Sequence, residues 1–300
     1  MKVSIGTAQF GLDYGISNIT GKISPNELKL IFDFMKKNDL NEFDSAQNYG
    51  EIEEIIGKKF SDTQKPVNVV SKYTINNTYR SGDIKNILTL SLNHLQASSI
   101  YGLLIHNFLD YSSNPNIWDE MVKLRKDGLI KNIGFSLYKP SELDLILDRN
   151  LDFDIIQIPF NIFDQRFKCY FDQLKKRNIL IYVRSIFMQG LVFLNSNFMD
   201  KKIIFTKKYI NFLTKISINS GLSINSLCLN YALAHDQISK IIIGVTSSEQ
   251  LSNNISLINQ FDKSDLIFKK LENLQMDDDD LSRIMKFLVD FQINRENLNK

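Results

Sequence analysis

The sequence predicts a single (β/α)8 barrel followed by a helical tail. Short β-rich runs alternate with helical patterns eight times along the 300 residues, and such units form parallel sheets with helical crossovers. The strands are strongly apolar, as strands covered on both faces are. Eight units in one chain favour a closed barrel over an open sheet. We expect the barrel over residues 1–261 and the tail, packed on or beside it, over 262–300.

Two periodicities place the individual elements. Short apolar runs rich in β-branched residues predict strands at 3–7, 42–46, 67–73, 101–107, 131–137, 153–159, 179–185 and 239–245. Helical spacing of apolar residues predicts helices at 25–37, 52–60, 83–95, 117–126, 141–148, 166–176, 209–217, 224–234 and 249–259. Ser24 before Pro25 is a typical helix start, and Gly128 after Asp127 is a typical helix end.

An open, doubly wound nucleotide-binding sheet is the competing architecture. That fold carries a glycine-rich fingerprint directly after its first strand. The corresponding segment here is Gly6-Thr7-Ala8-Gln9-Phe10-Gly11, which does not have the required glycine spacing. A dinucleotide site in this chain must therefore be built in another way.

Composition excludes several classes of function. Lys and Arg number 36 and Asp and Glu number 34, a balance that argues against a general nucleic-acid partner. No apolar run approaches the roughly 18 residues of a membrane span, and the first residues lack the apolar stretch of a signal peptide. We therefore expect a cytoplasmic protein with no membrane partner. Cys169 and Cys228 lack metal-site spacing, so we expect two buried free thiols and no metal site.

Reactive side chains follow three neighbouring predicted strands. Asp44 ends the second strand, with Tyr49 five residues further on, Lys72 ends the third and His106 the fourth. Active sites of these barrels lie at the carboxyl ends of the strands, so the four groups converge on one rim. Alone, each has an ordinary structural explanation, such as helix capping for the aspartate. Their occurrence together on one rim favours catalysis.

Elementary chemistry links these four groups. A lysine and an aspartate in an apolar interior should pair, because neither charge is tolerated there alone. A phenol beside that lysine should have a lowered pKa, because the cation stabilises the phenolate. Motifs of zinc proteases, P-loop nucleotide enzymes and α/β-hydrolases are absent from the sequence.

The sequence resembles the aldo-keto reductase family from about residue 3 to about residue 261. The resemblance rests on Phe43-Asp44-Ser45-Ala46-Gln47-Asn48-Tyr49-Gly50 with Gly57, on Ser71-Lys72, and on Leu103-Leu104-Ile105-His106-Asn107. Further matching positions are Gly6, Thr7, Gly128, Ile133-Gly134-Phe135-Ser136, Gln157, Gly244, Gln250 and Asn254. The segments Phe10-Gly11-Leu12-Asp13-Tyr14-Gly15 and Gln189-Gly190-Leu191 resemble a bacterial subset associated with surface-polysaccharide genes.

The resemblance implies an enzyme that reduces a small carbonyl compound, sugar-derived or otherwise, with NADPH. Tyr49 would donate the proton, Lys72 paired with Asp44 would lower the Tyr49 pKa, and His106 would orient the carbonyl. Ser136 and Gln157 would hold the nicotinamide carboxamide, and Gly244 to Asn254 the adenosine end. The implied cofactor-binding residues are Gly6, Thr7, Asp44, Ser136, Gln157, Arg184, Ser185, Gly190, Gly244, Thr246, Gln250 and Asn254.

Three positions depart from the family pattern. Leu137 stands where the family usually has asparagine, and Arg184 where many members place an aromatic residue against the nicotinamide. The segment 246–254 contains no Arg or Lys, although sites specific for NADP usually offer a cation to the 2′-phosphate. NADP is the first choice on family grounds, with NAD as the alternative.

Strand alternation in 179–185 places Leu180, Tyr182 and Arg184 on the barrel interior. Arg184 then either pairs with a loop carboxylate or lies beside the nicotinamide, where its charge favours anionic substrates.

Two other functions stay open: a cofactor-binding regulatory or partner-binding subunit with little turnover, and an isomerase or aldolase using Lys72 as a Schiff-base nucleophile. The pairing of Lys72 with Asp44 argues against the latter.

Overall fold

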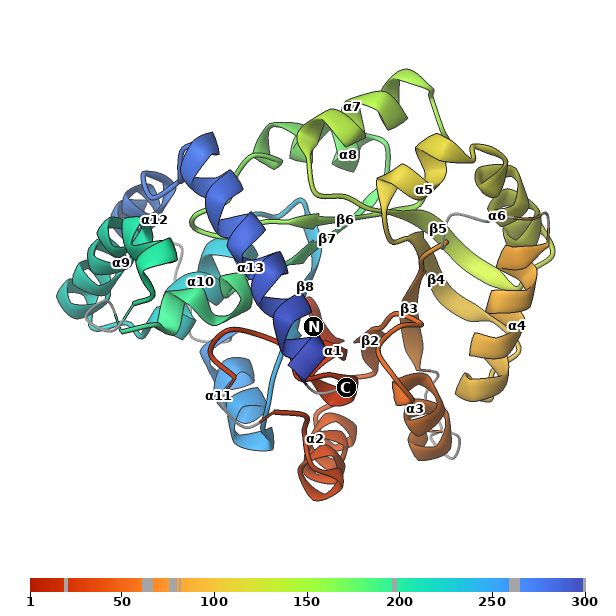
Figure 1. The fold of residues 1–300 in the computed structure, drawn as a ribbon, viewed down its shortest axis with the longest axis horizontal. Coiled ribbons are helices and arrows are strands. Elements are labelled where there is room, and N and C mark those ends of the chain that lie inside the picture. Colours follow the sequence, from red (N-terminus) through yellow and green to blue (C-terminus); the bar gives the residue numbers. More distant parts are fainter. Residues whose placement is uncertain are drawn as a thin grey trace.

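The computed structural model describes residues 1–18, 21–60, 67–75, 80, 82–195, 199–258 and 265–298. Within these residues, eight parallel strands close into a barrel in sequence order, with β8 paired to β1 (Figure 1). They are β1 Val3–Gly6, β2 Glu42–Asp44, β3 Asn68–Tyr73, β4 Ile100–Ile105, β5 Ile130–Ser136, β6 Ile155–Pro159, β7 Leu180–Arg184 and β8 Ile238–Gly244. The predicted closed barrel is confirmed, and strand bounds differ from those expected by at most two residues.

Helices surround the barrel, as the alternating pattern predicts (Figure 1). Ser24 caps the first long helix by accepting a hydrogen bond from the Glu27 amide, and Gly128 takes the positive φ of 76° expected after a helix end. The surrounding helices are α2 Pro25–Lys37, α3 Ile52–Phe60, α4 Asp83–Leu95, α6 Asn116–Lys126, α7 Pro140–Asp148, α8 Phe171–Lys176, α10 Ile224–Leu233 and α11 Ser248–Ile258. The last position of the helix expected at 249–259 lies outside the described residues.

Several shorter elements were not expected. Helices α1 and α5 have four and six residues, too few to produce a recognisable apolar period. The helix expected at 166–176 is a 3₁₀ turn, Lys168–Tyr170, followed by α8. The unexpected elements are α1 Ala8–Gly11, α5 Phe108–Ser113 and 3₁₀ segments at Met188–Phe193 and Lys201–Thr206. Helix α9 Lys207–Ser220 corresponds to the helix expected at 209–217, and the expected helical tail contains α12 Asp265–Glu272 and α13 Asp278–Leu298.

Apolar side chains form two separate clusters, one inside the barrel and one between the strands and the helices. A small cluster of five buried residues, with Leu180 and Tyr101 packed against it, occupies the interior: Val70, Leu104, Ile155, Tyr182 and Ile242. This confirms the predicted alternation along β7. The larger cluster lies between strands and helices and includes the edge-to-face rings of Phe32, Phe43 and Phe60. Filling the interior leaves only the rim of the barrel open for a ligand.

The carboxyl-terminal helices pack against the barrel instead of extending from it. Helix α13 buries Leu281, Ile284 and Leu288, so its inner face is apolar. Near its end, Arg295 donates hydrogen bonds to Asp13 and to the carbonyl of Gly15 in the segment after β1. The helix therefore crosses the same end of the barrel as the strand-terminal loops (Figure 1). The predicted boundary at 261/262 lies outside the described residues.

The structure shows how exposed the two cysteines are and whether a described helix could span a membrane. Cys228 is buried, but Cys169 is exposed, so the expectation of two buried thiols is wrong for Cys169. That residue lies in the surface turn Lys168–Tyr170, which has no buried member. In the described part of the chain, no helix has both the length and the apolar character of a membrane span.

Candidate active site

A cavity of about 380 Å³ opens where the strands end at their carboxyl side. Its size is typical of sites for small molecules and cofactors. Of all the catalytic and cofactor-binding residues expected from the sequence, Ser136 alone is not part of its lining. The others line it together: Gly6, Thr7, Asp44, Tyr49, Lys72, His106, Gln157, Arg184, Ser185, Gly190, Gly244, Thr246, Gln250 and Asn254.

Asp44 and Lys72 form a buried ion pair at the base of the cavity. The Lys72 Nζ lies 2.8 Å from both Asp44 carboxylate oxygens and 2.8 Å from the carbonyl of Ser45. Their side chains are 8% and 2% exposed, respectively. Burial lowers the Lys72 pKa, and the Asp44 charge opposes that shift. Because each charge compensates the other, removing either one would leave an isolated buried charge.

Tyr49 extends into the cavity from the loop after β2. Its ring packs edge-to-face on His106, with centroids 6.3 Å apart, and the Lys72 Nζ lies 5.6 Å from the ring centroid. Tyr49 lines the cavity, and among the described residues no hydrogen-bond partner reaches its hydroxyl. Gly11 makes this placement feasible, because a Cβ there would overlap the Tyr49 carbonyl. The segment after β1 thus packs directly on the Tyr49 backbone.

The pKa of Tyr49 differs from the sequence expectation. Burial raises the Tyr49 pKa well above 10, and the negative charge of Asp44 raises it further. The predicted lowering by Lys72 is therefore wrong for this structure. The physical reasons are that the phenol is buried and that the Lys72 ammonium is bound to both Asp44 oxygens, so little of its field is left to stabilise a phenolate. Tyr49 is a protonated phenol at neutral pH.

His106 directly follows the last residue of β4, and its ring lies edge-to-face with that of Tyr49. Burial lowers the His106 pKa to about 3, and the charges of Lys72 and Arg184 act in the same direction. Its Nδ1 lies 3.4 Å from the Thr74 hydroxyl. The imidazole is neutral near pH 7, so it can donate one N–H hydrogen bond but does not carry a second proton to give away.

Two buried polar atoms on neighbouring strands have no hydrogen-bond partner among the described residues. Ser136 and Gln157 occupy paired positions on β5 and β6. The Gln157 Nε2 donates to Asp44 at 2.6 Å, while among the described residues its Oε1 and the Ser136 Oγ have no hydrogen-bond partner. Unpaired buried polar groups are costly and call for an explanation. An acceptor next to a hydroxyl is complementary to a primary amide, which both donates and accepts.

Arg184 ends β7 and brings a second cation to the cavity. Its Nη2 donates to the Leu137 carbonyl at 2.9 Å, and its guanidinium carbon lies 4.2 Å from the Tyr138 ring centroid. Within the described ranges, no carboxylate lies at ion-pair distance from Arg184, so the loop ion pair considered from the sequence is not found. Leu137 itself is fully buried in the core and contributes only its backbone here.

The segment after β8 closes the other end of the cavity. Gln250 accepts a hydrogen bond from the Thr246 amide at 2.9 Å, and Ser247 caps α11 by accepting one from the Gln250 amide at 3.1 Å. Asn254 accepts from Asn225 at 3.1 Å. Among the described lining residues, the cations are Lys72 on β3 and Arg184 on β7. No lysine or arginine lies within 246–254.

Sequence reasoning missed one wall of the cavity. It is formed by the segment after β1, where Ile16 donates its amide to the carbonyl of Gln189 at 2.9 Å. Gly190 touches Ser17 so closely that a Cβ would overlap the serine side chain. The family-like segments at 10–15 and 189–191 were visible in the sequence, but their contact was not. The unassigned lining residues include Gln9, Tyr14, Gly15, Ser17, Asn18, Tyr138, Phe187, Gln189, Phe193 and Asn225.

Comparison with known proteins identifies the family of this chain. The sequence profile described as the Aldo/keto reductase family matches residues 2–275. The chain belongs to the aldo/keto reductase family. As a member, this aldo/keto reductase is an oxidoreductase that uses a nicotinamide cofactor and acts on a small-molecule carbonyl substrate. The cofactor supplies the redox chemistry and the protein supplies position and field.

Solved structures of other aldo-keto reductases share the fold. The holo form of an aldo-keto reductase from Bacillus halodurans is 18% identical, with a TM-score of 0.73 and 92% of each chain covered. A glycerol dehydrogenase from Gluconobacter oxydans is 21% identical, with a TM-score of 0.70, covering 91% of this aldo/keto reductase and 90% of that chain. No curated protein matches the sequence.

Proposed function

We propose that the enzyme reduces an aldehyde or ketone, sugar-derived or otherwise, to the alcohol, with hydride from NADPH or NADH and a proton from Tyr49. The observation that carries this proposal is the Tyr49 hydroxyl, which lies in the cavity between the buried Asp44–Lys72 pair and His106 and has no hydrogen-bond partner among the described residues. A phenol in this setting can donate a proton to a carbonyl oxygen that becomes an alkoxide. The test is to incubate the protein with a panel of aldehydes, ketones and sugars and with each cofactor. Oxidation of the reduced nicotinamide is measured by its absorbance.

The fit of a nicotinamide cofactor to this site rests on the two buried atoms that have no hydrogen-bond partner among the described residues. The Ser136 hydroxyl and the Gln157 Oε1 suit the carboxamide of a nicotinamide, which has one acceptor and two donors. Gly244, Thr246, Gln250 and Asn254 would line the adenosine end, with the amino-terminal end of α11 directed at the phosphates. When bound, the nicotinamide supplies the hydride.

Two groups could serve as proton donor, and their pKa values separate them. His106 has a pKa of about 3, so it is neutral at working pH and acts by donating a hydrogen bond that orients the carbonyl. Tyr49 keeps its proton because burial raises its pKa. An alkoxide is a much stronger base than a phenolate, so proton transfer from Tyr49 is downhill once hydride has arrived. Lys72 and Asp44 compensate each other's charge beside this phenol.

We expect NADPH and NADH to bind with affinities within about tenfold of each other. A charge-assisted contact to the 2′-phosphate contributes about 1.5–3 kcal/mol, and the segment 246–254 offers no cation for one. Fluorescence titration of the protein with each cofactor measures the difference. Tight binding of only one cofactor would contradict this expectation and would place a cation outside that segment.

We expect Arg184→Leu to raise KM for an anionic substrate about tenfold more than for a neutral one. The guanidinium lines the cavity without a carboxylate partner among the described residues, and it can grip a carboxylate or phosphate through parallel hydrogen bonds. Steady-state kinetics on a matched pair, a sugar acid and the corresponding neutral sugar, measures the effect. Equal changes in KM for the two substrates would remove Arg184 from substrate recognition.

A further inference from the structure

The cavity carries one positive charge that the described residues do not balance. Asp44 and Lys72 neutralise each other at 2.8 Å. His106 is neutral at working pH because its pKa is about 3. Arg184 remains, and no carboxylate of the described residues reaches it. A ligand in this cavity therefore experiences a net positive field.

That charge is anchored beside the proposed carboxamide site. The Arg184 Nη2 donates to the carbonyl of Leu137, the residue directly after Ser136. On the other side, Arg184 pairs in register with Pro159, two residues beyond Gln157. The guanidinium thus lies next to the strand ends that carry the two unpartnered groups, where the nicotinamide ring would be bound.

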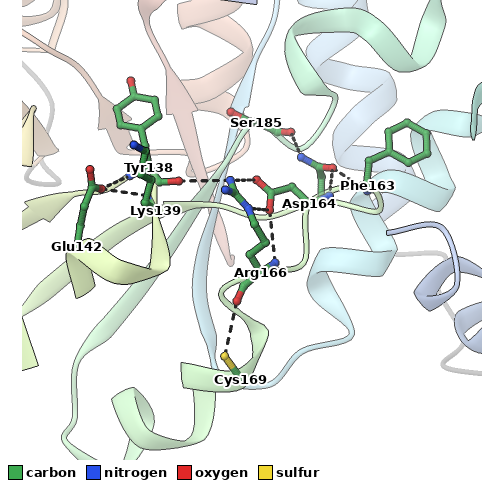
Figure 2. Close-up of polar contacts among 9 residues, drawn as sticks. Tyr138, Lys139, Glu142, Phe163, Asp164, Arg166, Cys169 and Ser185 are labelled. Carbon is green, nitrogen blue, oxygen red and sulfur yellow. Dashed lines mark hydrogen bonds and ion pairs between the residues drawn. The ribbon is translucent and has the colours of Figure 1, made fainter. Parts of the chain in front are cut away.

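A polar network holds this arrangement in place (Figure 2). Arg166 donates to both carboxylate oxygens of the buried Asp164 at 2.9 Å and to the carbonyl of Tyr138. Asn161 donates to the carbonyl of Ser185 at 3.0 Å. Ser185 follows Arg184 and has a positive φ of 62°, a conformation that needs support from its surroundings.

The network therefore fixes both neighbours of the Arg184 side chain. Tyr138, whose ring lies against the guanidinium, is held through its carbonyl, and the end of β7 is held through Ser185. Because both supports are restrained, the cation is positioned at the cavity wall and is not free to swing into solvent.

We propose that Arg184 makes this site discriminate between the redox states of the nicotinamide, favouring the reduced form and disfavouring the oxidised one. This inference rests on the proposed cofactor site. The oxidised ring carries a positive charge and the reduced ring is neutral, while the phosphates and ribose are the same in both. A like charge a few ångströms away, at the dielectric of a partly exposed site, changes affinity about 10- to 100-fold. The enzyme would take up reduced cofactor and release oxidised cofactor readily, which biases it towards carbonyl reduction.

Binding titrations of the two redox forms test the proposal without turnover. We would titrate the full-length wild-type protein with NADPH and with NADP⁺, and repeat both for Arg184→Gln, Arg184→Lys and the control Lys139→Gln. Lys139 is an exposed cation on the same rim that does not line the cavity. We expect wild type to bind NADPH about 10- to 100-fold more tightly than NADP⁺. Arg184→Gln should reduce this ratio about tenfold or more, whereas Arg184→Lys and Lys139→Gln should keep it within about threefold.

The outcomes separate this inference from the proposed function. Failure of wild type to bind either form would remove the cofactor site and the inference with it. Binding of both forms with an unchanged ratio in Arg184→Gln would overturn the inference alone. Wild-type protein that binds NADP⁺ as tightly as NADPH would also overturn it, and this readout does not depend on the folding of any variant.

Discussion

Replacing Tyr49 by phenylalanine should lower kcat by about 10²-fold or more while leaving the cofactor Kd within about twofold. The substitution removes one hydroxyl that has no hydrogen-bond partner among the described residues. The ring packing on His106 is retained, so the shape of the cavity should persist. The hydroxyl is needed only for proton transfer, so the loss should appear in kcat and not in binding.

Steady-state kinetics and fluorescence titration on the same preparation measure the two quantities. Tyr170→Phe is the matched control, because it removes a phenolic hydroxyl that donates to Asp144 outside the cavity. That variant should retain wild-type kcat. Wild-type turnover in Tyr49→Phe would rule out Tyr49 as the proton donor, and loss of cofactor binding would assign the hydroxyl to binding instead.

Replacing Lys72 by methionine should lower both activity and stability. The change leaves the Asp44 carboxylate buried with no cation against it, and breaking a buried pair in this way costs about 3–5 kcal/mol of folding free energy. Gln157 still donates to that carboxylate, so we expect the lower end of this range. Denaturant unfolding of wild type and Lys72→Met measures the loss.

The pH dependence of Lys72→Met follows from the Tyr49 pKa. Asp44 already raises the Tyr49 pKa, and its charge is unopposed in the variant, so the Tyr49 pKa rises further. Carbonyl reduction needs the protonated phenol, so its decline at alkaline pH should move to higher pH. Alcohol oxidation needs the phenolate, which becomes scarcer, so its rate should fall more than the reduction rate near neutral pH.

Rate profiles against pH in both directions measure this shift. The double variant Asp44→Asn with Lys72→Met is the matched control, because it removes both members of the pair. It should recover stability relative to Lys72→Met, since no buried charge is left unpaired. An unchanged pH profile together with unchanged stability in Lys72→Met would show that the pair does not act on Tyr49.

The barrel could be predicted from the sequence because the residues that indicate each strand and helix lie within or next to that element. The buried strands are continuous apolar runs, and helix starts such as Ser24 have a capping side chain within three residues. Convergence of Asp44, Lys72 and His106 followed from strand order alone, since parallel strands end at one rim. The inward position of Arg184 followed from alternation along β7 in the same way.

Other features depend on contacts that no local pattern contains. Arg295 holds Asp13 across a sequence separation of 282 residues, so the wall formed by the segment after β1 could not be predicted. The raised Tyr49 pKa depends on burial depth and on how completely Asp44 occupies Lys72. The sequence indicates which charged groups lie near Tyr49. The direction in which they shift its pKa depends on burial and on the distances between them in the folded site.

The most direct test of the central claim is the fate of deuterium carried at the reactive C4 position of the reduced nicotinamide. A carbonyl compound that is turned over in the substrate panel would be incubated with the labelled cofactor, and the product analysed by mass spectrometry and NMR. Hydride transfer predicts one deuterium bound to the former carbonyl carbon, in equal amount to the cofactor oxidised. Product without carbon-bound deuterium, or product formed with no cofactor oxidised, would contradict the account and favour isomerase or aldolase chemistry at Lys72.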